Sequence, residues 1–397
     1  MMNRSTSYAL GVHYAAMMCL AIAINLIPVF LTTLRVDLGG AAGLTNEQLG
    51  RLGAITFMGL VGGILLSGPM ADRWGARPFT VAGNGLIALG LILLGIAPGY
   101  GTACAAVFVM GVGAGILDMV LSPLVCALQP ERRTMAMNWL HSFYCIGAVC
   151  TVLAGAYALR CGLGWRALSL WMTVLPLLVT LAFVRLPLPP LVAQGETRTR
   201  LRQLVREPYF LATLAAICLG GATEAGLAQW LPAYAETTLG FSQWTSGLSL
   251  LYFSLAMAVG RMAIGMAGHR AGAFPLLLVC CWGSTALLVA GSFAPWSVVA
   301  LGACMAVGVT GSALWPSTLA VAADRFPQGG ASMFGLLAAC GNLGGVFMPW
   351  AVGWVADRSD LRWGLSIATL CPLLMGFLLL WLRAQSKPDV QHAATSP

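Results

Sequence analysis

Two carboxylates stand inside long apolar stretches of this chain. Asp118 lies in GVGAGILDMVLSPL (111–124), and Glu224 lies in GGATEAGLAQWLPAY (220–234). A carboxylate at the centre of a hydrocarbon layer costs at least ~2.5–3.5 kcal/mol, so such a group faces a watery cavity or pairs with another group. Asp118 and Glu224 are therefore predicted proton-coupling residues. The alternative for each is a structural acid that is hydrogen-bonded to a neighbouring helix.

Other polar and aromatic side chains in the apolar stretches could bind a solute. His141 lies one helical turn after Asn138, and Arg261 is deep enough in its stretch to act as a buried counter-ion. Aromatic rings with amide groups suit a neutral polyhydroxylated solute, whereas Arg261 and His141 could jointly bind one carboxylate. The predicted substrate-binding residues are Asn25, Asn138, His141, Gln229, Trp230, Tyr252, Arg261, Trp315 and Asn342.

The composition shows what kind of chain must position these groups. Of 397 residues, 59% are hydrophobic and only 9% are charged, against about 25% charged residues in a soluble domain. We therefore predict an all-α membrane protein with no water-facing domain of useful size. The basic residues are scattered over short loops, which argues against nucleic-acid binding. The sequence has no GxxxxGK[ST] loop and no metal-ligand cluster, so we expect neither an enzyme nor an ATP-driven pump, and no cofactor.

A helix needs about 20 apolar residues to cross ~30 Å of hydrocarbon. If the N-terminus is cytoplasmic, most basic residues near the segment ends, such as Arg73, Arg132 and Arg325, lie on the cytoplasmic side, as the positive-inside rule requires. Both termini are then cytoplasmic. The twelve segments that qualify as spans are 9–34, 47–70, 78–97, 102–128, 134–159, 166–186, 209–234, 243–267, 273–294, 297–322, 331–356 and 362–382.

The two halves of the chain are related by a constant offset. GPMADRWGARP (68–78) aligns with GMAGHRAGAFP (265–275) at a shift of 197 residues. This repeat indicates a duplicated six-helix unit, with the substrate expected between the halves near the midplane. The same shift also pairs Thr45 with Ser242, predicted as caps of the helices that follow them, Gly50 with Gly247, Pro130 with Pro327 and Gly147 with Gly344.

The repeat divides the chain into four parts. We predict an N-terminal six-helix bundle (1–186), a cytoplasmic linker (187–208), a C-terminal six-helix bundle (209–382) and a cytoplasmic tail (383–397). The linker is recognised by its polar, Arg-rich composition. The tail is too short to be a sensor domain, which argues against a receptor.

The stretch GPMADRWGAR (68–77) resembles the GxxxDRxGxR loop of the major facilitator superfamily. The resemblance implies a transporter with two pseudo-symmetric bundles, in which this loop is a latch that stabilises the outward-open state. In the second copy His269 replaces the aspartate, so a latch there would be weaker. The alternative role is topological anchoring alone. The predicted latch residues are Gly68, Asp72, Arg73, Gly75 and Arg77.

Three shorter motifs resemble the fucose/glucose cation-symporter branch of that superfamily. They are GxGxGxxD (111–118), NxxHxFY (138–144) and Ex(5)WLxxY (224–234). The resemblance implies sugar uptake driven by protons or sodium. Two residues depart from the branch: Ser122 replaces a frequent Asn, and Asn25 stands where a symporter can carry a carboxylate. Coupling is therefore left to Asp118, Glu224 or both.

We expect a secondary active transporter that takes up a small polar solute, such as a sugar, with protons by alternating access. We expect it in a bacterial-type inner membrane, as a monomer, coupled to protons rather than sodium. One alternative is a proton-coupled exporter of drugs or amphipathic metabolites; the lack of proline in CIGAVCTVLAGA (145–156) favours import. A second alternative is an importer of a small organic anion.

Overall fold

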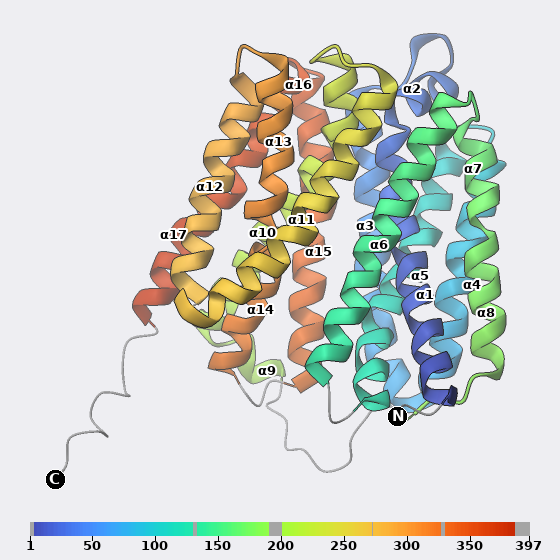
Figure 1. Cartoon of the computed structure of the whole chain (residues 1–397), viewed down its shortest axis with the longest axis vertical. Coiled ribbons are helices and arrows are strands. Elements are labelled where there is room, and N and C mark those ends of the chain that lie inside the picture. The colour runs from blue at the N-terminus through green and yellow to red at the C-terminus, as the bar shows by residue number, and fades with distance from the viewer. Residues whose placement is uncertain (1–3, 130–132, 190–200, 272, 327–329, 386–397) are drawn as a thin grey trace.

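The computed structural model describes residues 4–129, 133–189, 201–271, 273–326 and 330–385 (Figure 1). Within these ranges all regular structure is helical, and twelve helical segments are long and apolar enough to cross a membrane. The predicted spans agree closely with these segments; for example, the span predicted at 102–128 is observed at Tyr100–Leu128. The fold class predicted from the sequence is confirmed.

The first six spans form the N-terminal bundle. They are α1 (Arg4–Val29), α3 (Asn46–Trp74), α4 (Ala76–Gly95), α5 (Tyr100–Leu128), α6 (Arg133–Arg160), and α7 (Trp165–Met172) continued by α8 (Val174–Arg185). Two short elements, α2 (Leu31–Gly39) and η1 (Gly40–Ala42), connect α1 to α3.

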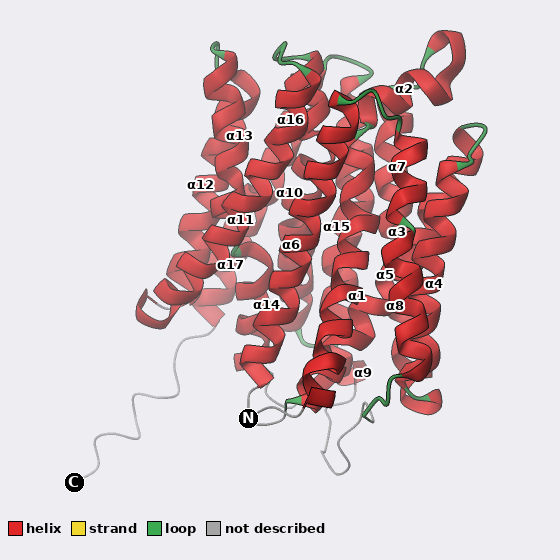
Figure 2. Ribbon diagram, turned by 45° about the vertical axis from the view of Figure 1, so that its right-hand side comes forward, coloured by secondary structure: helices red, strands yellow, loops and turns green. Residues whose placement is uncertain are grey.

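The last six spans form the C-terminal bundle (Figure 2). A short helix, α9 (Leu201–Leu204), precedes them. The spans are α10 (Pro208–Thr237), α11 (Gln243–Ala271), α12 (Ala273–Phe293), α13 (Ser297–Gly311) continued by α14 (Leu314–Arg325), α15 (Gly330–Ala356), and α16 (Leu361–Ser366) continued through η3 (Ile367–Thr369) into α17 (Leu370–Gln385).

The first span differs from its predicted bounds of 9–34. Helix α1 ends at Val29, and α2 begins at Leu31 after a non-helical residue, Phe30. Pro28 lies in the last turn of α1, and its ring removes one backbone donor and clashes with the preceding turn. The apolar run therefore continues past the true end of the helix.

The offset of 197 residues is visible in local structure. Thr45 caps α3: its side chain accepts a hydrogen bond from the Gln48 amide, and the Gln48 side chain accepts one from the Thr45 amide. Ser242 occupies the equivalent place before α11, where its hydroxyl oxygen accepts a 3.2 Å bond from the Thr245 amide. Both spans thus begin with a side-chain cap, as their sequence positions predict.

Glycines allow α3 and α5 to cross at close range inside the N-terminal bundle. A Cβ added to Gly63 would overlap the carbonyl oxygen of Val112 on α5, whereas a Cβ on the adjacent Gly62 would meet nothing within 4 Å. We therefore expect Gly63→Ala to destabilise the protein by about 1–3 kcal/mol, the usual cost of overpacking. Gly62→Ala should be neutral or slightly stabilising, because alanine favours a helix. Thermal melting in detergent checks this pair, and equal melting temperatures would contradict the crossing.

Among the described residues, the two bundles meet along three pairs of spans and through a smaller contact of α2 with α10, where the Thr32 hydroxyl donates a 2.8 Å bond to Glu236. Helix α3 packs on α15, α6 packs on α11, and α1 contacts α10. The start of α1 and the end of α17 lie at the same end of the molecule (Figure 1), which we call the terminal face. Helix α3 begins and α15 ends at the opposite end, which we call the far face.

Candidate substrate and proton site

An ion pair occupies the middle of the C-terminal bundle. The Glu224 Oε2 atom on α10 lies 3.6 Å from the Arg261 Nη2 atom on α11, and the two side chains are 26% and 27% exposed. Glu224 is roughly 24 Å along α10 from its start, at 1.5 Å per residue. Residues 220–223 and 225–227 around it are all buried. The exposed part of the Glu224 side chain therefore faces an internal space rather than the outside of the bundle.

Helix α6 of the N-terminal bundle supplies groups that face this ion pair. The Cys145 Sγ atom lies 3.9 Å from the Arg261 Nη1 atom. His141 is exposed and lies within electrostatic range of Arg261, and Tyr144 lies within range of both charges. Both bundles thus contribute to one polar site, as expected for a carrier that binds its solute between them.

Helix α1 closes another side of the site. The Asn25 Nδ2 atom donates a 2.9 Å bond to the Ala21 carbonyl and a longer, 3.5 Å bond to the Tyr144 hydroxyl oxygen. Asn25 is 8% exposed. The structure therefore joins four of the predicted residues, Asn25, His141, Glu224 and Arg261, through α1, α6, α10 and α11.

Arg261 keeps hydrogen-bonding capacity that its described neighbours do not use. Its Nε atom is buried and has no hydrogen-bond partner among the described residues. A guanidinium carries five N–H donors in a planar fork that matches a carboxylate or another planar anion. Leaving a buried donor unpaired costs free energy, so this arrangement suits a bound solute that accepts the free bonds.

Asp118 is half-buried and stands apart from the ion pair. No described residue offers it a hydrogen bond or ion pair, and no described contact joins it to Glu224 or Arg261. Gly111 and Gly115, on the neighbouring part of α5, are buried against α3, while Ser122, one turn toward the terminal face, is again half-buried. Asp118 is therefore not sealed inside the bundle and stays a candidate for proton binding.

Two predicted substrate ligands pack between the bundles, and one of them, Gln229, keeps a buried Nε2 atom that has no hydrogen-bond partner among the described residues. Trp230 is fully buried, and its Nε1 atom donates a 2.9 Å bond to the Pro349 carbonyl. Gln229 is 4% exposed and packs directly on Gly53 of α3. The prediction that Trp230 contacts substrate is corrected, because its ring is fully packed and its Nε1 atom is already hydrogen-bonded to Pro349.

Tyr252 does not reach the site. It is 53% exposed on α11, in one stripe with Leu255, Val259 and Met262. Arg261 follows about two and a half turns later, at 3.6 residues per turn, and so lies on the opposite face of the helix. An exposed apolar stripe opposite a polar site suits lipid contact, and Tyr252 is removed from the predicted binding set.

The remaining predicted ligands have mixed outcomes. Trp315 on α14 is half-buried and packs against Gly341 and Gly221, one turn from Glu224. Asn342 is half-buried and donates a 3.0 Å bond to Ala338 on its own helix. The side chain of Asn138 lies outside the described residues.

The predicted latch makes its described contacts inside the N-terminal bundle. Gly75 ends α3 with a φ of 77°, a conformation that favours glycine, and Arg77 donates a 3.1 Å bond to the Leu186 carbonyl at the end of α8. Gly68 faces Met119, Arg73 is exposed, and the Asp72 side chain lies outside the described residues. The latch role remains a prediction.

Two groups at the site were missed by sequence reasoning. Tyr144 appeared only as part of a motif, and Cys145 is one of many cysteines in apolar helices. The signal that could have found them is their spacing from His141, because residues three and four apart share a helix face.

Twelve membrane-spanning helices in two related bundles, with a charged pair of one bundle facing α6 of the other, are typical of a multi-pass membrane transporter. Residues 14–308 and 248–396 match the family model of the Major Facilitator Superfamily. The chain belongs to this superfamily, and it is a transporter rather than an enzyme.

Two sequence relatives have names that state a solute. The chain is 27% identical over 316 residues to "Probable nitrate/nitrite transporter NarK2" of Mycobacterium tuberculosis, covering 75% of this chain and 77% of that protein. It is 25% identical over 355 residues to "Putative niacin/nicotinamide transporter NiaP" of Bacillus subtilis, covering 84% and 87%.

Solved structures share the fold. A bacterial homologue of the human lysosomal transporter Spinster superposes with a TM-score of 0.80 at 14% identity, covering 98% of this chain and 100% of that one. A D-xylose-proton symporter superposes with a TM-score of 0.74 at 15% identity, covering 92% and 96%. The family model identifies the superfamily, and the resemblance to the fucose/glucose branch stays a prediction.

Proposed function

We propose that this protein imports a small anion, such as a carboxylate, together with protons by alternating access. The observation that carries the proposal is the Glu224–Arg261 ion pair, 3.6 Å apart and partly exposed at the junction of the bundles. Of the substrate classes predicted from sequence, the ion pair favours the organic anion over the sugar. Trp230, whose ring would stack on a sugar, is fully buried in packing.

The names of the sequence relatives point the same way. One names nitrate and nitrite, which are small anions, and the other names niacin, a ring carboxylic acid, together with nicotinamide, its neutral amide. A planar anion is the partner that the Arg261 fork fits best. His141, beside Arg261, offers a second donor to the same anion.

The proposed coupling is an exchange of partners on Arg261. In the empty carrier Glu224 is ionised and neutralises Arg261. A proton then binds Glu224, the released guanidinium binds the anion, and the bundles rock to expose the site on the other side. When the proton and anion leave, the ion pair re-forms. The site is neutral both in the empty carrier and in the loaded one, the two forms in which the bundles rock, because an unpaired charge in a low-dielectric site is strongly unfavourable.

The proposal also covers the orientation of the protein in the membrane and the role of Asp118. The terminal face is placed in the cytoplasm of a bacterial-type cell, the protein works as a monomer in the inner membrane, and no cofactor takes part. Asp118, on the other bundle, is assigned a second proton-binding role. Coupling to protons rather than sodium predicts that replacing sodium with choline leaves uptake unchanged.

A thermal-shift screen of the purified protein tests the substrate class. The panel contains nitrate, acetate, lactate, benzoate and nicotinate beside glucose, fucose and xylose, each at two pH values. A ligand that binds the folded state raises the melting temperature by mass action. We expect anions to stabilise the protein more at the lower pH, because the proposed exchange binds a proton together with the anion, and Arg261→Ala to abolish the shift.

A matched control is available for the arginine. Arg166 forms an exposed ion pair with Asp37 at 3.7 Å, and Arg166→Ala should leave the ligand shift intact. Stabilisation by a sugar and by none of the anions would replace the anion proposal with the sugar one.

A further inference from the structure

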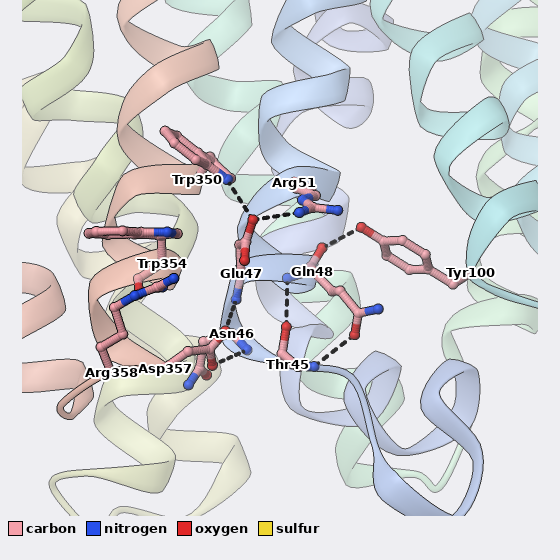
Figure 3. A network of polar contacts seen from close by, with 10 residues as sticks. All are labelled: Thr45, Asn46, Glu47, Gln48, Arg51, Tyr100, Trp350, Trp354, Asp357 and Arg358. Carbon is pink, nitrogen blue, oxygen red and sulfur yellow. Dashed lines mark hydrogen bonds and ion pairs between the residues drawn. The ribbon is translucent and has the colours of Figure 1, made fainter.

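A carboxylate from one bundle caps a helix of the other at the far face (Figure 3). Asp357 directly follows α15, and its Oδ1 and Oδ2 atoms accept 2.7 Å bonds from the backbone amides of Asn46 and Glu47. These amides belong to the first turn of α3, where backbone N–H groups lack partners within the helix. The positive end of the helix dipole also favours a negative charge there. Asp357 therefore joins the bundles by hydrogen bonds and by charge.

Neighbouring groups hold α15 against the same turn of α3. The Trp350 Nε1 atom donates a 3.0 Å bond to Glu47 Oε1, which is also paired with Arg51 (Figure 3). A Cβ on Gly353 would overlap the Asn46 carbonyl, so the two helices touch through their backbones. Moving one bundle away from the other would break this contact.

The sequence repeat reveals a second contact of the same design. At the offset of 197 residues, Asp357 corresponds to Arg160 at the end of α6, and Glu47 corresponds to Trp244 in the first turn of α11. The Arg160 guanidinium carbon lies 5.3 Å from the centre of the Trp244 ring. The two crossings are therefore pseudo-equivalent, but one is closed by a carboxylate cap and the other by a cation–π contact.

The backbones at the second crossing also approach through a glycine. A Cβ on Gly247 of α11 would lie 3.0 Å from the Ala156 Cβ atom on α6. Gly50 is the equivalent of Gly247 and faces the Pro349 carbonyl on α15. Both crossings thus close through a glycine at the far face.

We propose that Asp357 is the main clasp of a two-part far-face gate, and that Arg160 and Trp244 form its weaker second part. The gate must open in each transport cycle, so the Asp357 cap sets the balance between the two access states. The clasp rests on alternating access and on the far-face contacts, not on the anion site, so its failure would leave the role of Glu224 and Arg261 untouched.

Hydrogen–deuterium exchange of the full-length protein in lipid nanodiscs tests the clasp. In Asp357→Ala we expect deuterium exchange to be about fivefold faster, the change in opening equilibrium that corresponds to the loss of a typical helix cap. The increase should appear in peptides covering 43–52 and 354–362. It should also appear in 157–165 and 238–248 at the second crossing, because the bundles separate as units. Asp357→Asn keeps one acceptor oxygen without the charge and should lie between Asp357→Ala and the wild type.

Asp360 provides the matched control. Its side chain caps α16 within its own bundle by accepting a 3.0 Å bond from the Trp363 amide. Asp360→Ala should quicken exchange in 361–366 and leave the second crossing unchanged. Faster exchange confined to 43–52 in Asp357→Ala would show local fraying of α3 and overturn the proposal. An equal effect of Asp360→Ala at the second crossing would do the same.

Discussion

Glu224→Gln should abolish proton-driven accumulation of substrate while leaving exchange of bound for free substrate intact. Glutamine resembles the protonated acid, so the anion can still reach Arg261. The empty carrier, however, must then return with an unpaired guanidinium in its centre. Breaking a buried ion pair by removing one partner costs about 3–5 kcal/mol, which predicts a fall in net uptake of about 100-fold or more.

Proteoliposomes separate the two modes. Net uptake is driven by an inward proton gradient, and exchange is measured by counterflow with the anion that stabilises the protein most. Glu207→Gln is the control, because Glu207 is an exposed acid directly before α10, the helix that carries Glu224. Undiminished gradient-driven uptake in Glu224→Gln would exclude Glu224 from coupling.

Gly50→Leu should block transport without unfolding the protein. A Cβ at Gly50 would overlap the backbone of Pro349. A backbone cannot relieve such a clash by changing rotamer, as a side chain can. Separating the bundles at the far face would relieve this clash. At Gly63, where α3 crosses α5 inside one bundle, no such movement is available. Overpacking costs about 1–3 kcal/mol, so the closed far face should lose population and uptake should fall about 10- to 100-fold.

The control for this variant lies on the same helix. Gly62→Leu adds the same side chain where a Cβ meets nothing within 4 Å, and it should transport normally. Melting temperature and monodispersity should be close to the wild type in both variants. Normal uptake by Gly50→Leu would mean that the far face need not close during transport.

The spans and the repeat could be predicted because they depend on hydropathy, which lipid imposes on every crossing helix. The first span shows the limit: apolar residues continue through Phe30, but Pro28 ends the helix. The constant offset predicted Thr45 and Ser242 as caps, and the structure bears this out.

The site could be predicted only in part. Glu224 and Arg261 were both selected as charges in apolar helices, but their pairing depends on how α10 and α11 rotate about their axes. In a membrane the lipid-facing and core-facing sides of a helix are both apolar, so the pattern does not reveal rotation. For the same reason the sequence pattern does not separate ligands from residues such as Tyr252, which faces away from the site, and Trp230, which packs between the bundles. Asp357 left no signal, because its partners are backbone amides of the other bundle.

The most direct measurement is the number of protons that the purified protein takes up when an anion binds. It is read from a pH indicator in weakly buffered detergent solution, near the midpoint of the pH dependence of binding. If the anion displaces Glu224 from Arg261, the wild type should take up close to one proton for each anion bound, and Glu224→Gln should take up none. Anion binding without proton uptake in the wild type, or with equal uptake in Glu224→Gln, would contradict the exchange of partners on Arg261.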